Sequence, residues 1–370
     1  MREVIRELIY LASSAVNGTE AEPDCLTAID MDALYNFACE QKMEALAAYA
    51  LDAAGVHEPR FADALDSEIR RAILFDLDLN AVLAGLEERK IWHLPLKGAV
   101  MREYYPQIGM RQMADFDILF DPQRAEDVRE LMESLGFRTV HYGQGHQDDY
   151  QKEPVSHFEM HRMLFSDHDQ QLLYRYFQDF ADRRLPEEGF RCRFSNEDFY
   201  LFMLAHAFKH ADYSGIGLRA LLDIYVFLVR FEDHMDWDYL RRELDACGIL
   251  DFEDESRRLA QKIFIEGKTD DLDDAELRTL SLYAQAGMYG NDELLYRRRV
   301  EKTGRLGYFL GKMILPMNKV KRFYPFFYSH KFLLPLLPFY RLAAGRKRAA
   351  RELRAVWKAA RDTDKKKTDD

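Results

Sequence analysis

Two aspartates separated by one residue, Asp115 and Asp117, begin an apolar stretch that ends at Phe120. In an extended strand the side chains alternate between the two faces, so both carboxylates point the same way while the apolar residues between them enter a core. Paired carboxylates on a rigid strand suit a hard divalent cation and the phosphate oxygens that it binds. The sequence therefore predicts a strand over 116–120 with a metal site on one face.

A second chemical feature lies shortly before these aspartates. Gly98 stands between a short strand predicted over 91–96 and a helix predicted over 98–105. Glycine lets a backbone approach a polyphosphate closely, and the N–H groups at a helix start favour anions. Lys97 beside it is expected to contact phosphate, and the alternative is a lysine exposed to solvent at the helix start.

A metal site of this kind needs a third carboxylate, and Glu159 is the candidate. It lies on a strand predicted over 155–164, on which His157, Glu159 and His161 share one face. The 42 residues from Asp117 to Glu159 leave room for a helix over 123–135 and a returning hairpin, which would place the two strands side by side. The alternative is an exposed strand face on which Glu159 is solvated between two histidines.

The rest of the pattern predicts helices before and after this region. Helical spacing of apolar residues is clear over 61–88 and again from Ser195 onward. A strand is predicted over 137–142, followed by a polar loop over 143–154.

Composition limits the class of protein. The four cysteines are scattered and include no C-x-x-C pair, which argues against a disulfide framework and a zinc knuckle. Charges interrupt the first residues and no uncharged run of about 18 residues occurs, so we expect a cytoplasmic protein with no transmembrane segment.

The charge distribution is uneven. Residues 301–361 hold 15 Lys and Arg against two acids, a net charge of +13. Because the whole chain has a net charge of −12, the remaining residues carry −25. Residues 319–361 also contain many aromatics. This segment is expected to wrap the acidic body, to bind RNA, or to lie on an anionic membrane surface.

Together these motifs resemble the uncharacterised bacterial nucleotidyltransferases of the DNA polymerase beta-like superfamily. The resemblance covers about residues 60–345. It is carried by the following matches: Leu96-Lys97-Gly98, Tyr105-Pro106, Gly109, Arg111, Asp115 to Leu119, Glu159-Met160-His161, His206, Lys209-His210, Leu218-Arg219, Leu222-Asp223-Ile224, Phe323-Tyr324-Pro325 and Leu334-Pro335.

The resemblance implies an α+β fold, in which a polymerase-beta-like core of mixed sheet flanked by helices is joined to helical N-terminal and C-terminal regions. The expected parts are a helical region (1–60), a catalytic domain (61–190), a helical substrate- and nucleotide-binding domain (195–300), a basic aromatic segment (301–361) and a disordered tail (362–370).

It also implies transfer of a nucleoside monophosphate from an NTP to an acceptor. Asp115, Asp117 and Glu159 would hold two Mg²⁺ ions, and Glu159 could also take the acceptor's proton. The acceptor stays open among a small molecule, a protein side chain and a tRNA 3′ end. The superfamily's Gly-Ser or Gly-Gly turn is Gly98-Ala99 here, so a catalytically inactive nucleotide-binding scaffold is the alternative.

Other residues are expected to bind the nucleotide. For Arg111, the choice is between a phosphate or base contact and a structural salt bridge to Asp115 or Asp121. His206 and His210 are four apart on one predicted helix, as are Arg219 and Asp223 on the next. By resemblance all four line the cleft, and the alternative is a buried polar network. A zinc hydrolase based on the two histidines lacks the acid of an H-E-x-x-H motif.

Overall fold

The computed structural model describes residues 2–26, 28–166, 171–213, 215–285, 287, 317, 320 and 324–344. The predicted tail and most of the basic segment lie outside these residues, so the predictions for them stay untested. Among the described helices, none combines the length and the apolar character that crossing a bilayer requires. The chain divides into two compact units, one of residues 1–212 and 216–288 and one of residues 213–215 and 289–370.

A five-stranded mixed sheet lies in the first unit, in the order β1-β2-β5-β4-β3. Strands β2 and β5 are parallel, and the other neighbouring pairs are antiparallel. The bounds are β1 His93–Pro95, β2 Phe116–Phe120, β3 Arg138–His141, β4 Gln147–Lys152 and β5 Ser156–His161, with a separate hairpin of β6 Leu185–Pro186 and β7 Cys192–Arg193. The predicted mixed sheet and the pairing of the Asp117 strand with the Glu159 strand are confirmed.

One element differs from the sequence prediction. The polar loop expected over 143–154 contains strand β4, which pairs with β5 along its whole length. Its inward-facing Asp148 is fully buried, where a hydrophobic residue would be expected. Arg162 contacts that carboxylate at 2.7 Å and the Gly143 N–H donates to it at 2.7 Å, so the buried charge is compensated. The loop prediction was wrong because a charged residue at a buried position breaks the alternation of apolar and polar residues by which a strand is recognised.

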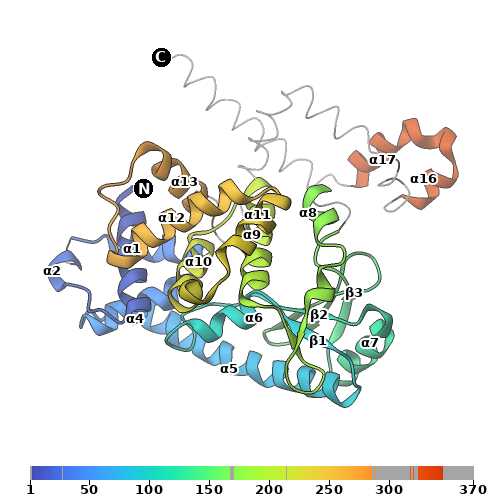
Figure 1. The fold of residues 1–370 in the computed structure, drawn as a ribbon, viewed down its shortest axis with the longest axis horizontal. Coiled ribbons are helices and arrows are strands. Elements are labelled where there is room, and N and C mark those ends of the chain that lie inside the picture. The colour runs from blue at the N-terminus through green and yellow to red at the C-terminus, as the bar shows by residue number, and fades with distance from the viewer. Residues whose placement is uncertain are drawn as a thin grey trace. The chain divides into compact units, whose positions relative to one another are not determined.

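One face of the sheet is apolar. Phe116, Ile118, Phe158 and Met160 enter a core with the second half of helix α5 (Pro59–Glu88) and with helix α7 (Ala125–Ser134). Figure 1 shows α5 as a long helix that passes α6 (Gly98–Met101) and reaches the strands. The alternation of the two strands thus leaves the opposite face for Asp117 and Glu159.

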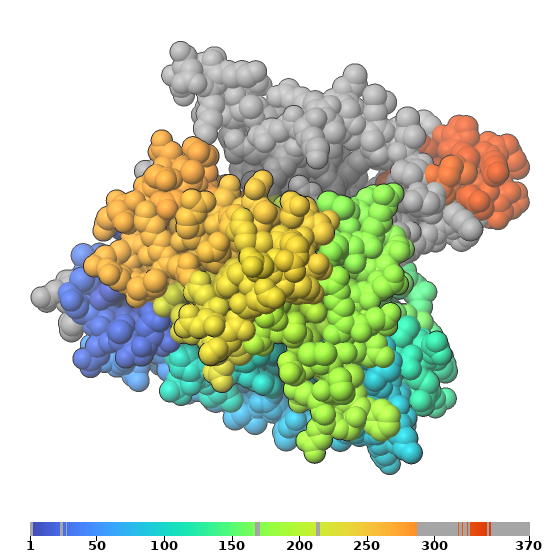
Figure 2. Space-filling model, in the orientation of Figure 1, coloured from blue at the N-terminus to red at the C-terminus, as the bar shows by residue number. Residues whose placement is uncertain are grey.

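Helices form a second, larger core, to which the other face of the sheet contributes Leu94, Leu96 and Leu119. Segments far apart in sequence meet here, and Figure 2 shows the first helix (blue) close to the later helices (orange). The helices are α1 Arg2–Asn17, α2 Pro23–Leu26, α3 Met31–Gln41, α4 Glu44–Ala53, α8 Gln171–Tyr176, α9 Asn196–Tyr213, α10 Leu218–Phe231, α11 Trp237–Ala246, α12 Leu250–Glu266 and α13 Asp274–Ala284.

Short 3₁₀ turns complete the first unit, at Arg102–Tyr104, Pro122–Arg124, Phe180–Arg183 and Glu232–His234. The described part of the second unit comprises α16 (Pro325–Ser329), a 3₁₀ turn over Lys331–Leu336 and α17 (Leu337–Ala344). Within it, the rings of Phe327 and Tyr340 lie 5.3 Å apart between centroids.

Candidate active site

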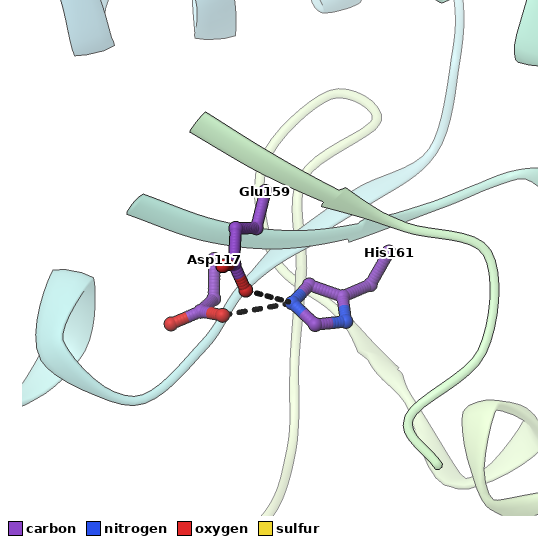
Figure 3. A group of neighbouring side chains, drawn as sticks. All are labelled: Asp117, Glu159 and His161. Carbon is purple, nitrogen blue, oxygen red and sulfur yellow. Dashed lines mark hydrogen bonds and ion pairs between the residues drawn. The ribbon is translucent and has the colours of Figure 1, made fainter. Parts of the chain in front are cut away.

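Asp117 and Glu159 are register partners on the parallel strands β2 and β5. Together with His161, two residues further along β5, they place one ligand atom each within 4.8 Å of one another. His161 Nε2 lies 2.7 Å from Asp117 Oδ1 and 3.6 Å from Glu159 Oε2. Figure 3 shows the three side chains turned toward a common point from the two strands. Glu159 therefore lies in a cluster of ionisable side chains rather than on a solvated strand face.

Lys97 lies against the same cluster. Its Nζ donates to Asp117 Oδ1 at 2.7 Å, and its side chain is 16% exposed. The interpretation of Lys97 as a solvent-exposed lysine is therefore wrong. Its backbone φ of 43° is strained for a residue with a side chain, and such strain costs about 1–3 kcal/mol. The residue lies between β1 and α6, and its ion pair links this turn to Asp117 on β2.

The charges in the cluster shift its pKa values strongly. Burial raises the pKa of Asp117, but the Lys97 ammonium and the His161 ring outweigh it, so the net pKa lies well below the ordinary range. Burial lowers the pKa of Lys97 and of His161, but the neighbouring carboxylates raise both above their ordinary values. Each of the three groups thus stabilises the charged form of its neighbours.

Asp115 precedes β2 and is half-buried beside this cluster. Burial, and then the negative charges of Asp117 and Glu159, raise its pKa to about 6. Asp115 is therefore close enough to Asp117 and Glu159 for their charges to repel one another. A divalent cation would relieve that repulsion, and carboxylate oxygens are the donors that Mg²⁺ prefers.

The turn at Gly98 is closed from the other side by Arg111. A Cβ atom at Gly98 would lie 2.5 Å from Arg111 Nη1 and 2.6 Å from Met113 Sδ, so a larger residue would displace the ends of both side chains. The backbone N–H groups of Ala99 and Val100 donate to carbonyls of the turn itself. Gly98 thus packs closely against two side chains, and its expected contact with phosphate stays a prediction.

Arg111 forms a buried salt bridge, but its partner is Asp223 on α10 rather than the predicted Asp115 or Asp121. Its Nε and Nη2 donate to the two Asp223 oxygens at 2.9 and 2.8 Å, and Tyr105 Oη donates to the same carboxylate at 2.8 Å. Arg219, also buried, donates to the Gln112 carbonyl at 2.6 Å. These contacts tie α10 to the segment before β2 and favour the polar-network interpretation. Nucleotide binding by Arg111, Arg219 and Asp223 stays a prediction.

Helix α9 lies across from the cluster. Its His206 and His210 approach within 3.1 Å between Nε2 atoms. Burial, and then the positive charge of Lys97, lower the pKa of His206 well below its ordinary value, so this ring is neutral. Two groups of potential metal ligands occur among the described residues, and neither includes His206 or His210.

The structure therefore brings Lys97, Asp115, Asp117 and Glu159 together, whereas Arg111, Arg219 and Asp223 form a separate buried network. Sequence reasoning assigned no role to His161, which binds Asp117. Its signal was present, because the spacing that identified Glu159 places His161 on the same strand face.

A family model described as "Uncharacterised nucleotidyltransferase" matches residues 27–265. No curated protein and no solved structure matches the chain. The matched range spans more than half of the chain and includes the sheet, the carboxylate cluster and helices α9 and α10. This protein therefore belongs to the family of uncharacterised nucleotidyltransferases.

Proposed function

We propose that this nucleotidyltransferase moves a nucleoside monophosphate from an NTP to an acceptor hydroxyl or amine with the help of two Mg²⁺ ions. The acceptor attacks the α-phosphorus and pyrophosphate leaves. We further propose that its sheet is a polymerase-beta-like core, as the resemblance to the bacterial enzymes implies. The observation that carries the proposal is the pairing of Asp117 with Glu159 across parallel strands, with Asp115 close enough to sense both charges.

The donor set fits this metal. Asp115, Asp117 and Glu159 offer hard oxygen donors on one face, and burial together with the charges of Asp117 and Glu159 raises the pKa of Asp115. Lys97 and His161 both contact Oδ1 of Asp117, so neither contact uses Oδ2. When bound, Mg²⁺ would neutralise the triphosphate and lower the pKa of the acceptor oxygen.

Glu159 is suited to accept the acceptor's proton. Its side chain is 20% exposed, so an incoming hydroxyl or amine can reach it, whereas Asp117 is nearly buried. His161 lies 3.6 Å from Glu159 Oε2 and limits the orientations of that carboxylate. A positioned carboxylate of this kind contributes by general base catalysis.

Lys97 is suited to bind the triphosphate. The Lys97 ammonium already lies among the carboxylates. If it moved from Asp117 to a phosphate oxygen of the bound nucleotide, it would still have an anionic partner. His206 and His210 of α9, whose Nε2 atoms lie 3.1 Å apart, would contact the nucleotide, as the resemblance implies. Positioning and charge neutralisation then supply most of the rate.

The test is transfer of label from each α-³²P-labelled NTP, with Mg²⁺ and cell lysate, to an acceptor. Fractionating the lysate into small molecules, proteins and RNA identifies the acceptor class. The Asp115→Asn, Asp117→Asn double variant should abolish labelling. Asp121→Asn, at the end of the same strand, is the matched control and should label normally.

Equal labelling by the wild type and the double variant would contradict the proposal. Mg²⁺-dependent NTP binding in calorimetry without any transfer would instead support the scaffold alternative.

A further inference from the structure

Four adjacent strands carry a continuous row of polar side chains across the sheet. The register pairs Asp117 on β2 with Glu159 on β5, Glu159 with Asp149 on β4, and Asp149 with His141 on β3. Neighbouring strands lie about 4.8 Å apart, so three carboxylates stand in line at that spacing. Like charges directly opposite one another destabilise a sheet. Lys97 and His161 compensate the Asp117 end of the row.

A second group of potential metal ligands lies at the other end. Asp149, His157 and Glu159 place one ligand atom each within 4.8 Å of one another. All three side chains are half-buried, so an ion can reach them from solvent. This group differs from the Mg²⁺ site proposed above because it replaces an aspartate with an imidazole.

Two neighbours hold Asp149 in place. Gln147 Nε2 lies 3.1 Å from Asp149 Oδ1, and His141 Nδ1 lies 2.9 Å from Asp149 Oδ2. Metal-binding carboxylates are commonly oriented by such outer hydrogen bonds. The Asp149 carboxylate is therefore already restricted in orientation before an ion binds, which lowers the entropic cost of binding.

We propose that Asp149, His157 and Glu159 bind a transition-metal ion of the Zn²⁺ class, beside the Mg²⁺ site and sharing Glu159 with it. Zinc accepts His nitrogen and Asp or Glu oxygen as ligands, and sites with three protein ligands leave the fourth position to water. Imidazole also favours Zn²⁺, Co²⁺ and similar ions over Mg²⁺. His141 acts as a positioning residue through Asp149.

Occupation of this site has a consequence that rests on the proposed function. A zinc ion that engages Glu159 would compete for this carboxylate with both Mg²⁺ and the acceptor's proton. Zn²⁺ would therefore inhibit transfer even when Mg²⁺ is in excess.

The test uses the full-length protein with excess Mg²⁺ and titrates Co²⁺ as a spectroscopic probe, with Zn²⁺ competition and equilibrium dialysis for stoichiometry. One equivalent should bind with a visible Co²⁺ absorption that Zn²⁺ displaces. His157→Ala should weaken this binding by about 100-fold or more, and His141→Ala by about 10-fold, as expected for the loss of a ligand and of an outer partner.

Two matched variants separate the possibilities. His234→Ala, at an exposed histidine, should bind Co²⁺ as the wild type does. His161→Ala should also retain the site, because His161 belongs to the other group. Undiminished binding by His157→Ala, or loss of binding in His161→Ala alone, would overturn the proposal. Melting temperatures of all variants check folding.

The transfer assay is read separately. Zn²⁺ should inhibit the wild type at concentrations at least about tenfold below those that inhibit His157→Ala. If the wild type transfers no label, the proposed function fails, whereas the Co²⁺ titration still decides whether the metal site exists.

Discussion

The two faces of the five-stranded sheet differ sharply although the same strands build them. Phe116 and Phe158 enter an apolar core on one face. The next residue of each strand, Asp117 and Glu159, places its carboxylate on the other face. The apolar face fixes where the strands lie, and the polar face uses that fixed position for chemistry. Substitutions on the two faces should therefore separate loss of stability from loss of activity.

The largest effect is expected for Glu159→Gln on the polar face. Transfer should slow by about 10²- to 10⁴-fold, because the amide cannot accept the acceptor's proton. The free energy of unfolding should change by less than about 1 kcal/mol, since removing the charge also relieves repulsion from Asp117. Single-turnover kinetics and urea denaturation measure the two quantities. A stability loss as large as that of a core variant would contradict the separation of the faces.

Phe158→Ala tests the apolar face. The ring is fully buried and lies 5.1 Å from Phe116 and 5.2 Å from Phe137 between centroids. Its removal should lower the free energy of unfolding by about 3–5 kcal/mol, as is typical of buried aromatic residues. Phe158→Leu is the matched control and should cost less than about 1.5 kcal/mol. An unchanged urea midpoint in the alanine variant would contradict the packing described here.

Asp223→Asn tests whether the buried network is structural. The substitution leaves Arg111 as an uncompensated buried charge, so stability should fall by about 3 kcal/mol. The double variant Arg111→Met, Asp223→Leu removes both charges and should recover most of this loss. Its KM for NTP should stay near that of the wild type. A rise in KM of about tenfold or more would instead support nucleotide binding by these residues.

The smallest effect is expected for Tyr105→Phe. The variant loses one hydrogen bond to the charged Asp223, which typically contributes about 1.5–3 kcal/mol. Tyr49→Phe loses a bond to the neutral Ile108 carbonyl near the surface and should cost about 1 kcal/mol or less. Thermal denaturation compares the two. Equal losses would show that the Asp223 network adds no stability through Tyr105.

The sequence predicted the parts of the sheet where alternation is regular. The strand over Phe116–Phe120 was predicted with its bounds. Its pairing with the strand that carries Glu159 followed from the length of chain between the two strands. Helix α5 was also predicted nearly to its ends, because its apolar positions recur over many turns. Local periodicity suffices for such elements.

Contacts between distant residues were not predictable in the same way. Arg111 and Asp223 meet across 112 residues, and Lys97 reaches Asp117 from the preceding turn. Choosing these partners requires the tertiary packing of α10 and of the Gly98 turn, which no local pattern encodes. The strand β4 was missed for a related reason, since the buried Asp148 is stabilised by Arg162 from another segment.

A crystal structure of the full chain with Mn²⁺ and a non-hydrolysable NTP, with anomalous data at the manganese edge, tests the proposed metal site most directly. We expect metal peaks within coordination distance of the oxygens of Asp115, Asp117 and Glu159, with Lys97 turned from Asp117 to the triphosphate. A bound nucleotide with no metal at these carboxylates, or with the Lys97–Asp117 ion pair intact, would contradict this expectation.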